Sequence, residues 1–451
     1  MANSYLSRTI SSAGSLTTWT FSAWVKLSEP GTSNCAIFSQ GSSGNNVTSI
    51  FFNHSNGAHR LEWRQYENSY TARKTTNRAF SDKSGWYHIV CQWDSTNGTA
   101  GDRMKIYVNG ERETSFENST DPSSSLSSII NSTTGTMHIG TYWNTSSNLF
   151  NGYMSHVTFV NNAIVAPTSF GQTDSTSGIW KFKSPSGVTF GNNGFHLKME
   201  NSGAMGTDSS GNSNTFTVNG NLKQSLDTPS NVHATFNPLA LWNHNGTLRI
   251  PAYSNGNLTA GYDNSSYNEV AFGNLGVNKG KWYWEVKATN VTDASGNARI
   301  GIGDIQYTDT DPQNTTSTVY YQGNGQKRVS GSASSYGATY TGGNIIGVAM
   351  DLDNNKLYFH KDGVYQNSGV PTSGSTGTGA IAIPTGDYVY TIQCEDYASS
   401  GTRVMDLNTG SGFFGTTAIT SAGSNGNGSL FEYDVPSGYY ALNTKNINTY
   451  G

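Results

Sequence analysis

The stretch that most constrains the fold of this chain is residues 345–363. An apolar run at 345–352 ends in Asp353-Asn354-Asn355, a second strand-like run follows at 356–361, and Asp362-Gly363 closes the segment. Asp-Gly suits a tight β-hairpin because both central residues of a type I′ turn need positive φ. The same pattern occurs upstream, where a strand-like run at 104–108 is followed by Asn109-Gly110. Two such hairpins, far apart in the chain, predict two β domains.

Composition supports an all-β protein of more than one domain. The chain has 451 residues, with 52 Gly and 25 Tyr, and only 12% of its residues are charged, about half the usual share. Aromatic residues reach 12%, which argues against a disordered chain. We expect many short Tyr-rich strands joined by polar loops.

Charge and hydropathy exclude several classes of partner. The net charge is -4 and the pI about 6.1, so we expect no nucleic-acid binding. No stretch approaches the roughly 20 apolar residues of a membrane helix, and the N-terminus lacks the pattern of a signal peptide. We therefore expect synthesis in a cytoplasm and no membrane insertion. Cys35, Cys91 and Cys394 are too scattered for a disulfide framework and are predicted to be buried free thiols.

The first 170 residues contain ordered sequence blocks of a known kind. They are Phe-Ser-Ala-Trp-Val at 21–25, Trp-Tyr-His-Ile-Val at 86–90, Tyr-Val-Asn-Gly at 107–110, His-Ile-Gly at 138–140 and Phe-Asn-Gly-Tyr-Met at 150–154. In this order they resemble a laminin-G-like domain of the concanavalin-A-like lectin family. The resemblance implies a jelly-roll sandwich of two antiparallel sheets over residues 1–170.

The second half resembles a different domain. Gly-Lys-Trp-Tyr-Trp-Glu-Val at 280–286, Ile-Gly-Ile-Gly at 300–303 and the 345–363 hairpin stand in the order of a SPRY domain. This implies a second antiparallel β-sandwich over residues 241–443, although the Gly-, Ser- and Asn-rich chain beyond residue 414 departs from the ordinary module. Residues 171–240 are interpreted as an extended connector that packs on the domains, and residues 444–451 as a C-terminal tail.

The order of these parts is similar to that in proteins encoded by marine bacteriophages, where a lectin-like domain precedes a SPRY-like domain in a tail fibre or another virion protein. The resemblance implies a virion structural or adhesion protein: a tail fibre, head fibre or capsid decoration subunit. Its expected partners are other virion proteins, further copies of itself and a glycan or other receptor on the host surface. Its expected location is the virion, reached by synthesis in the host cytoplasm and release by lysis.

Catalysis is not expected. Glycoside hydrolysis needs two carboxylates at a set separation, and Glu62, Glu67, Glu285 and Glu395 are isolated strand residues. Two alternatives to an adhesion protein stay open: a polysaccharide-degrading tailspike enzyme, and a purely architectural cement protein that binds no ligand. No cofactor is expected. A weak calcium site stays open as an alternative in the polar loop at Asp309 and Asp311.

The candidate ligand contacts are aromatic residues in polar surroundings. An aromatic face stacks on a sugar ring while neighbouring polar groups bind its hydroxyls, and the low charge of the chain favours a neutral glycan. The competing interpretation is that these rings fill the rims of the sandwiches. The candidate glycan contacts are Trp63, Tyr66, Tyr142, Trp143, Tyr262, Tyr320, Tyr321 and Tyr336.

Overall fold

The structure is a computed structural model that describes residues 3–28, 31–240, 242–244, 247–263, 269–292, 294–306, 315–397 and 403–451. The chain forms two compact units, residues 1–224 and residues 225–451. Both are built almost entirely from antiparallel β-sheet. The expected all-β fold of two sandwich domains is confirmed.

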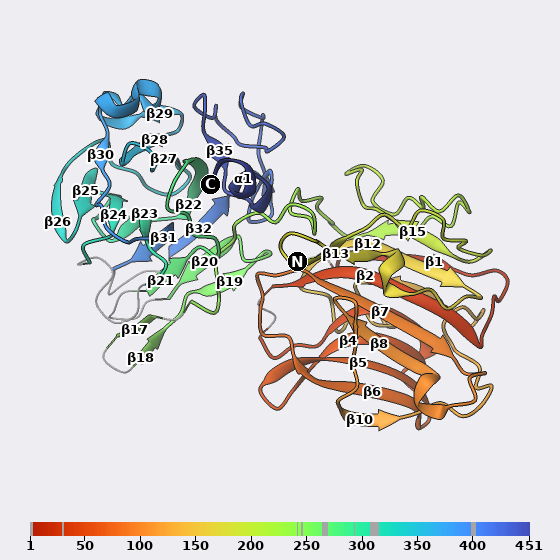
Figure 1. The fold of residues 1–451 in the computed structure, drawn as a ribbon. Helices are drawn as coiled ribbons and strands as arrows, with labels where there is room; N and C mark the ends of the chain where they lie inside the picture. Colours follow the sequence, from red (N-terminus) through yellow and green to blue (C-terminus); the bar gives the residue numbers. More distant parts are fainter. Residues whose placement is uncertain are drawn as a thin grey trace. The chain divides into compact units, whose positions relative to one another are not determined.

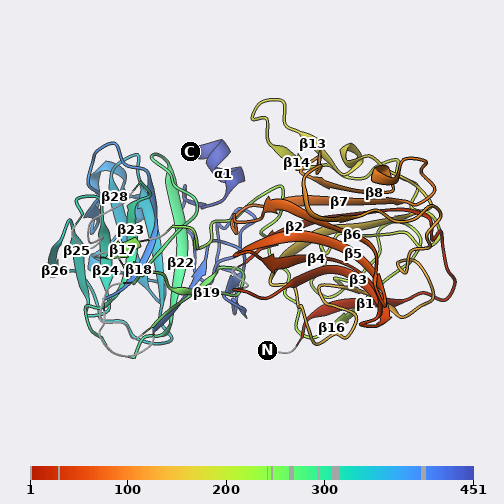
Figure 2. The same ribbon diagram turned by 90° about the horizontal axis from the view of Figure 1, so that it is seen from below.

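Unit 1 contains two large sheets that form stacked layers (Figures 1 and 2). The eight-stranded sheet has the order β10 (Phe116–Thr120), β6 (Tyr70–Ala79), β5 (Ala58–Glu67), β4 (Asn46–Ser55), β3 (Cys35–Ser43), β11 (Thr136–Ile139), β1 (Tyr5–Thr9) and β16 (Thr217–Asn219). The six-stranded sheet has the order β15 (Phe195–Leu197), β12 (Gly152–Asn161), β2 (Thr18–Leu27), β7 (Tyr87–Asp94), β8 (Met104–Val108) and β9 (Glu111–Arg112). The remaining elements are the pair β13 (Gly171–Thr173) and β14 (Trp180–Phe182) and the 3-10 turns η1 (Ala100–Asp102) and η2 (Pro167–Ser169).

The core of unit 1 lies between these sheets. Strand β7 shows why: alternate residues of the strand, Ile89, Cys91 and Trp93, point into the core, while Val90 on its other face is buried in a second apolar cluster. Trp93 stacks on Trp19 with ring centroids 6.2 Å apart. The thiol of Cys91 is buried, and burial raises its pKa. Cys35 and Cys394 are likewise buried and free.

The hairpin predicted at Asn109-Gly110 joins β8 to β9. Both residues have positive φ, 49° and 84°, as a type I′ turn requires. The corresponding turn in unit 2, between β28 and β29, has φ of 49° at Asp362 and 85° at Gly363. The two turn predictions are therefore confirmed.

Unit 2 has the same general plan. Its larger sheet has the order β19 (Ala252–Ser254), β20 (Thr259–Tyr262), β32 (Arg403–Asn408), β22 (Lys281–Asn290), β27 (Ile345–Asp351), β28 (Lys356–Lys361) and β29 (Val364–Tyr365), with β30 (Ile381–Ala382) on β28 and β35 (Tyr440–Ala441) on β22. The six-stranded sheet has the order β21 (Glu269–Phe272), β31 (Tyr390–Asp396), β23 (Ala298–Asp304), β24 (Val319–Gln322), β25 (Gln326–Val329) and β26 (Ser332–Ser335). The short elements are β17 (Trp242–His244), β18 (Thr247–Arg249), β33 (Phe413–Phe414), β34 (Thr417–Ala418), η4 (Gln366–Ser368), η5 (Pro371–Thr376) and α1 (Thr444–Tyr450).

The stretch predicted as a connector, residues 171–240, is divided between the two units. Its first part adds edge strands to unit 1, because β15 pairs with β12 and β16 pairs with β1. Phe195, Leu197 and Phe216 bury their side chains in that core. Its last part belongs to unit 2, where Ala234 and Phe236 are fully buried. The apolar residues of this stretch explain the outcome, since burying each one is worth about 1.5–3 kcal/mol.

The segment after β32, residues 409–443, is called the C-terminal extension below. It covers the face of the larger sheet of unit 2 around β22, β27 and β28, where Phe431, Val435 and Tyr439 pack on Tyr283, Ala349 and Tyr358. In Figure 1 it is the dark blue chain near β35 and α1. The predicted tail at 444–451 is mostly helix α1, whose N-cap Asn443 accepts a hydrogen bond from the Asn446 N–H.

One carboxylate fastens this extension to the sheet. The Glu285 side chain on β22 is 0% exposed and accepts hydrogen bonds from the backbone N–H groups of Glu432 and Tyr433, both 2.9 Å long. It also accepts from the Tyr283 hydroxyl at 3.0 Å and the Asn408 amide at 3.3 Å. Burial nevertheless raises the pKa of Glu285 to about 7.

Of the helices in the described part of the chain, none has the length and apolarity that a membrane span requires.

Candidate functional site

The strongest candidate site lies on the face of the eight-stranded sheet that points away from the core of unit 1, called the outer face below. Alternation along β5 sends Leu61 and Trp63 into the core and therefore places Arg60, Glu62 and Arg64 on the outer face. The strand register sets Arg64 opposite Arg73 on β6. Side chains from three adjacent strands, β4, β5 and β6, thus meet on one surface.

Glu62 is the buried centre of this surface. Its side chain is 0% exposed, and one of its oxygens accepts hydrogen bonds from Arg73 Nη2 at 2.9 Å, Thr75 Oγ1 at 2.9 Å and Asn53 Nδ2 at 3.1 Å. Its other oxygen lies 3.4 Å from Arg64 Nη1. A buried charge is tolerated only when it is paired and hydrogen-bonded in this way. Glu62 therefore orients both arginines and is itself shielded from solvent.

Tyrosines surround the two guanidinium groups. Arg64 donates to the hydroxyl of Tyr142 at 3.2 Å and to that of Tyr70 at 3.4 Å, and its guanidinium carbon lies 4.8 Å from the centre of the Phe51 ring. The Arg73 guanidinium lies 4.6 Å from the centre of the Tyr70 ring. We call Glu62, Arg64, Tyr70, Arg73 and Tyr142 the arginine–tyrosine cluster.

The loop between β11 and β12 brings Tyr142 to the cluster. This loop is held against β3, because Ser39 Oγ donates to the carbonyl of Thr141 at 3.0 Å. Tyr142 and the next residue, Trp143, are both partly exposed, with ring centroids 6.5 Å apart. On the other side, Tyr66 meets Tyr70 edge-on at 5.0 Å. The structure therefore places three predicted contacts, Tyr66, Tyr142 and Trp143, in or beside one solvent-accessible cluster.

The other predicted contact of unit 1 is a core residue. Trp63 is 0% exposed and packs against Trp19 and Trp93, with centroid distances of 5.3 and 6.0 Å. The prediction of a surface role for Trp63 is wrong because the residue occupies an inward position of β5. A sugar cannot stack on a ring that is enclosed on all sides.

The four predicted contacts of unit 2 are also buried. Tyr262, Tyr320 and Tyr321 are at most 2% exposed and Tyr336 is 8% exposed. Two of their hydroxyls donate hydrogen bonds to buried groups: the Tyr262 hydroxyl to the Cys394 carbonyl at 3.0 Å, and the Tyr320 hydroxyl to Gln393 Oε1 at 2.8 Å. Burial raises the pKa of Tyr336 to about 12. Tyr262 is the last residue of β20 and Tyr336 directly follows β26, whereas Tyr320 and Tyr321 lie inside β24, all four of whose residues are buried. The prediction that these four rings contact a ligand is therefore wrong, because all of them are buried in the unit.

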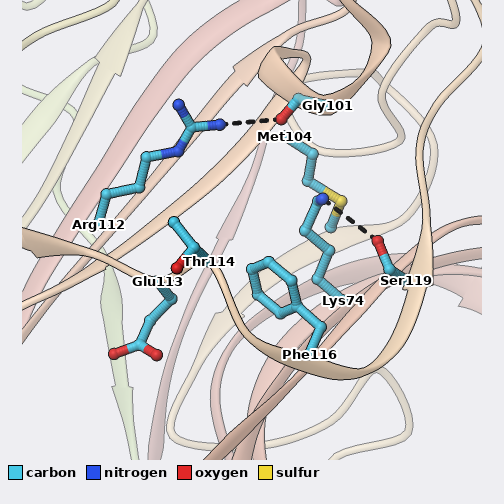
Figure 3. A pocket seen from close by; sticks show the side chains of 8 residues that line it. All are labelled: Lys74, Gly101, Met104, Arg112, Glu113, Thr114, Phe116 and Ser119. Carbon is cyan, nitrogen blue, oxygen red and sulfur yellow. Dashed lines mark hydrogen bonds between the residues drawn. The ribbon is translucent and has the colours of Figure 1, made fainter.

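A small pocket opens at the edge of unit 1, beside β10, with a volume of about 260 Å³. Figure 3 shows Lys74, Phe116 and Ser119 on one side and Arg112 on the other. Both cations already have carboxylate partners, since Lys74 Nζ lies 2.8 Å from Asp121 and Arg112 Nη2 lies 2.6 Å from Asp102. A ligand would have to displace these partners.

A larger recess of about 420 Å³ lies beneath the same β11–β12 loop that carries Tyr142. Its walls carry amides and hydroxyls and no charged side chain, as suits a neutral hydroxylated molecule. The residues that line it are Ser33, Asn34, Cys35, Ser146, Asn148, Leu149 and Asn151.

The described residues contain no group of three or more His, Cys, Asp or Glu side chains that could hold a metal ion. Asp309 and Asp311, the alternative calcium site, lie outside the described residues. Two acidic residues of the 345–363 hairpin already accept hydrogen bonds from backbone N–H groups. Asp351 accepts from the Asn354 backbone N–H at 3.0 Å, and Asp353 accepts from the Gly280 N–H at 2.8 Å.

The arginines of the cluster were missed by the sequence prediction. Arg60, Glu62, Arg64 and Tyr66 are spaced two residues apart, so strand alternation puts them on one face. The predicted contacts were aromatic residues only, so Arg64 was not among them, although it lies two positions from the predicted contact Tyr66 on the same face.

Comparison with known families agrees with this architecture. Residues 2–168 match the concanavalin A-like lectin/glucanases superfamily, and residues 281–381 match the SPRY domain. The search of curated proteins found no match.

Solved structures similar to parts of the chain include the SPRY domain of human HERC1, at 14% identity and a TM-score of 0.29 over 38% of this chain and 96% of that one. A heptameric SAP-like pentraxin from Limulus polyphemus matches at 18% identity and a TM-score of 0.27, over 36% of this chain and 72% of that one. A putative carbohydrate binding protein from Bacteroides ovatus matches at 17% identity and a TM-score of 0.33, over 51% of this chain and 59% of that one.

Proposed function

We propose that this chain is an adhesion protein that binds glycans through the arginine–tyrosine cluster of unit 1. One observation carries the proposal: a sandwich matching the lectin superfamily presents partly exposed Tyr142 and Trp143 and exposed Tyr70 beside two guanidinium groups on one face. Exposed aromatic rings next to hydrogen-bond donors are what recognition of a sugar requires.

The cluster is suited to binding because it is held in place before a ligand arrives. Glu62 fixes Arg64 and Arg73, and Arg64 in turn holds the hydroxyls of Tyr70 and Tyr142. Each immobilised side chain that is already ordered spares about 0.5–1.5 kcal/mol on binding. The sugar would stack on the tyrosine or tryptophan rings and direct its hydroxyls towards the guanidinium N–H groups and the phenolic oxygens.

We further propose that the protein works as part of a bacteriophage virion, as a tail fibre, head fibre or capsid decoration subunit, and reaches the particle in the host cytoplasm before lysis. The order of the two domains supports this proposal through its resemblance to phage proteins. Assembly with other virion proteins and with further copies of itself would multiply weak contacts to a glycan-covered cell.

We propose a binding protein without catalytic activity and without a cofactor. The acidic residue of the cluster, Glu62, supports this view, because its oxygens are occupied by four donors and its side chain has no exposed surface. The polysaccharide-degrading tailspike and the ligand-free cement protein are the alternatives that the experiment below separates from adhesion.

The test is binding of the purified chain to host cells and to an array of oligosaccharides, with Tyr142→Ala and Trp143→Ala variants. Tyr397→Ala in unit 2 is a matched control, since that ring is also exposed, at 46%. Adhesion predicts that the first two variants lose binding while their unfolding temperatures and the control stay at wild-type values. Release of new reducing ends from a bound polysaccharide would instead establish an enzyme, and absence of binding to both cells and array would leave a cement protein.

A further inference from the structure

The arginine–tyrosine cluster carries an uneven share of accessible charge. Arg64 and Arg73 each keep 22% of the side chain exposed, whereas Glu62, the carboxylate between them, is 0% exposed. Two positive charges therefore face one negative charge, and only the positive partners reach solvent. The neighbouring Arg60 adds nothing to this balance because it pairs with Glu117 at 3.4 Å, both partly exposed.

The two guanidinium groups also retain hydrogen-bonding capacity. A guanidinium has five N–H donors, and Arg73 uses one nitrogen, Nη2, in its bond to Glu62. Arg64 uses Nη1 towards Glu62 and Tyr70 and Nη2 towards Tyr142. In the described residues the Nε atoms of both arginines are buried and have no hydrogen-bond partner. Because these Nε atoms are buried, a ligand cannot reach them, and the N–H groups left for a ligand are those on the Nη atoms of the two partly exposed side chains.

We infer that the glycan bound by this cluster is anionic and presents a carboxylate or sulfate group to Arg73 and Arg64. The inference rests on the proposed function, and it revises the expectation of a neutral ligand that the low overall charge suggested. Planar guanidinium groups bind carboxylates and sulfate-like oxyanions through paired N–H···O bonds, and such charge-assisted bonds are roughly twice as strong as neutral ones.

The tyrosines fit the same ligand. Each of the Tyr70 and Tyr142 hydroxyls accepts a hydrogen bond from Arg64, and among the described residues neither donates one to the carboxylate of Glu62. Both hydroxyl protons can therefore point towards an oxyanion. The rings of Tyr70 and Trp143 are left for the faces of the sugars. The arginines would thus bind the anionic group of the glycan, and the aromatic rings would pack against the sugar rings.

The test compares matched oligosaccharides on one array: a neutral set, the same backbones bearing uronate carboxylates, and the same backbones bearing sulfate. We expect at least tenfold tighter binding of one anionic set than of the neutral set, and weakening of that binding as salt rises from 50 to 300 mM, because partly exposed charges are screened. The carboxylate and sulfate sets identify which group is recognised.

Three variants distinguish specific binding of the anionic group at the cluster from non-specific attraction of an anion to a positively charged surface. Arg73→Gln should weaken anionic binding about tenfold, as expected for loss of one charge-assisted interaction, and should weaken any neutral binding by a smaller factor, because a neutral acceptor bonds less strongly to a guanidinium group. Arg73→Lys keeps the charge but not the paired geometry and should recover only part of the affinity. Arg112→Gln removes a cation on another sheet that is more exposed than Arg73, 40% against 22% of the side chain, and should have no effect. Unfolding temperatures confirm that each variant is folded.

Equal affinity for neutral and anionic sets, or an unaffected Arg73→Gln, overturns the inference. If Tyr142→Ala still abolishes binding in that case, the proposed adhesion function stands and only the anionic ligand is rejected. If no set binds and host cells are not bound, both proposals fail together.

Discussion

Glu285 gives unit 2 a distinctive dependence of stability on pH. Burial raises the pKa of this carboxyl to about 7 in the folded state, from an ordinary value of 4.5. A raised carboxyl pKa means that the folded state holds its proton more tightly than the unfolded state. The stabilisation is therefore complete below pH 4.5 and is lost as pH rises towards 7. At about 1.36 kcal/mol per pKa unit, the full effect is on the order of 3 kcal/mol.

Most of this effect, about 2–3 kcal/mol, falls between pH 5 and pH 8, since the unfolded carboxyl is already partly ionised at pH 5. Glu285→Gln removes the titration while keeping the size of the side chain. We therefore expect the unfolding free energy of unit 2 to fall by about 2–3 kcal/mol more in the wild type than in the variant over this range. With a urea m-value of roughly 2.5 kcal/mol/M, this is a difference of about 1 M in the midpoint shift.

The assay is hydrogen exchange of peptides from β22 at increasing urea, which reports unit 2 separately from unit 1. His360, whose pKa burial lowers to about 3, contributes in the opposite direction in both proteins. The Tyr283 hydroxyl contacts both His360 and Glu285, so the comparison removes the part of this contribution that does not depend on Glu285. Identical pH profiles for the wild type and Glu285→Gln would refute the reasoning and would mean that the four hydrogen bonds to Glu285 offset its burial.

Three further substitutions have defined outcomes. Trp63→Ala should destabilise unit 1 by about 3–5 kcal/mol, as a fully buried tryptophan does, and calorimetry should show a lower unfolding temperature, which Tyr142→Ala should not produce. Arg403→Ala should lower the free energy of unfolding of unit 2, measured with urea, by about 3–5 kcal/mol, because it removes the arginine that lies 2.9 Å from the buried Asp396 carboxylate. Wild-type stability of this variant would mean that the pair is open to solvent. Gly301→Ala should destabilise unit 2, since its Cβ would overlap the Val319 carbonyl oxygen, and an unchanged unfolding temperature would contradict so close an approach.

The periodic parts of the fold could be predicted from the sequence. Alternation in 86–93 assigns Ile89, Cys91 and Trp93 to one face, and these residues lie in the core. The Asn-Gly and Asp-Gly turns have the predicted positive φ values. Both signals are local, since they depend on backbone geometry within a few residues.

The candidate site was harder to predict because exposure is not a local property. Tyr320 and Tyr321 are adjacent in β24 and point to opposite faces, so alternation would expose one of them, yet both are buried. What covers them comes from elsewhere in the chain: Tyr320 bonds to Gln393, and the Tyr321 ring packs on Phe359. The pairing of Arg64 with Arg73 likewise depends on the register between β5 and β6.

The strand order also has a consequence for synthesis of the chain. In unit 1 the first strand, β1, pairs with β11 and β16, so that sheet is complete only after residue 219 has left the ribosome. In unit 2, β22 lies between β27 and β32, and the covering segment follows β32 in the chain. The apolar surface of β22, β27 and β28 therefore stays open during most of translation of the second half. Non-local pairings of this kind form slowly, and we expect nascent chains stalled before residue 403 to aggregate or to bind chaperones.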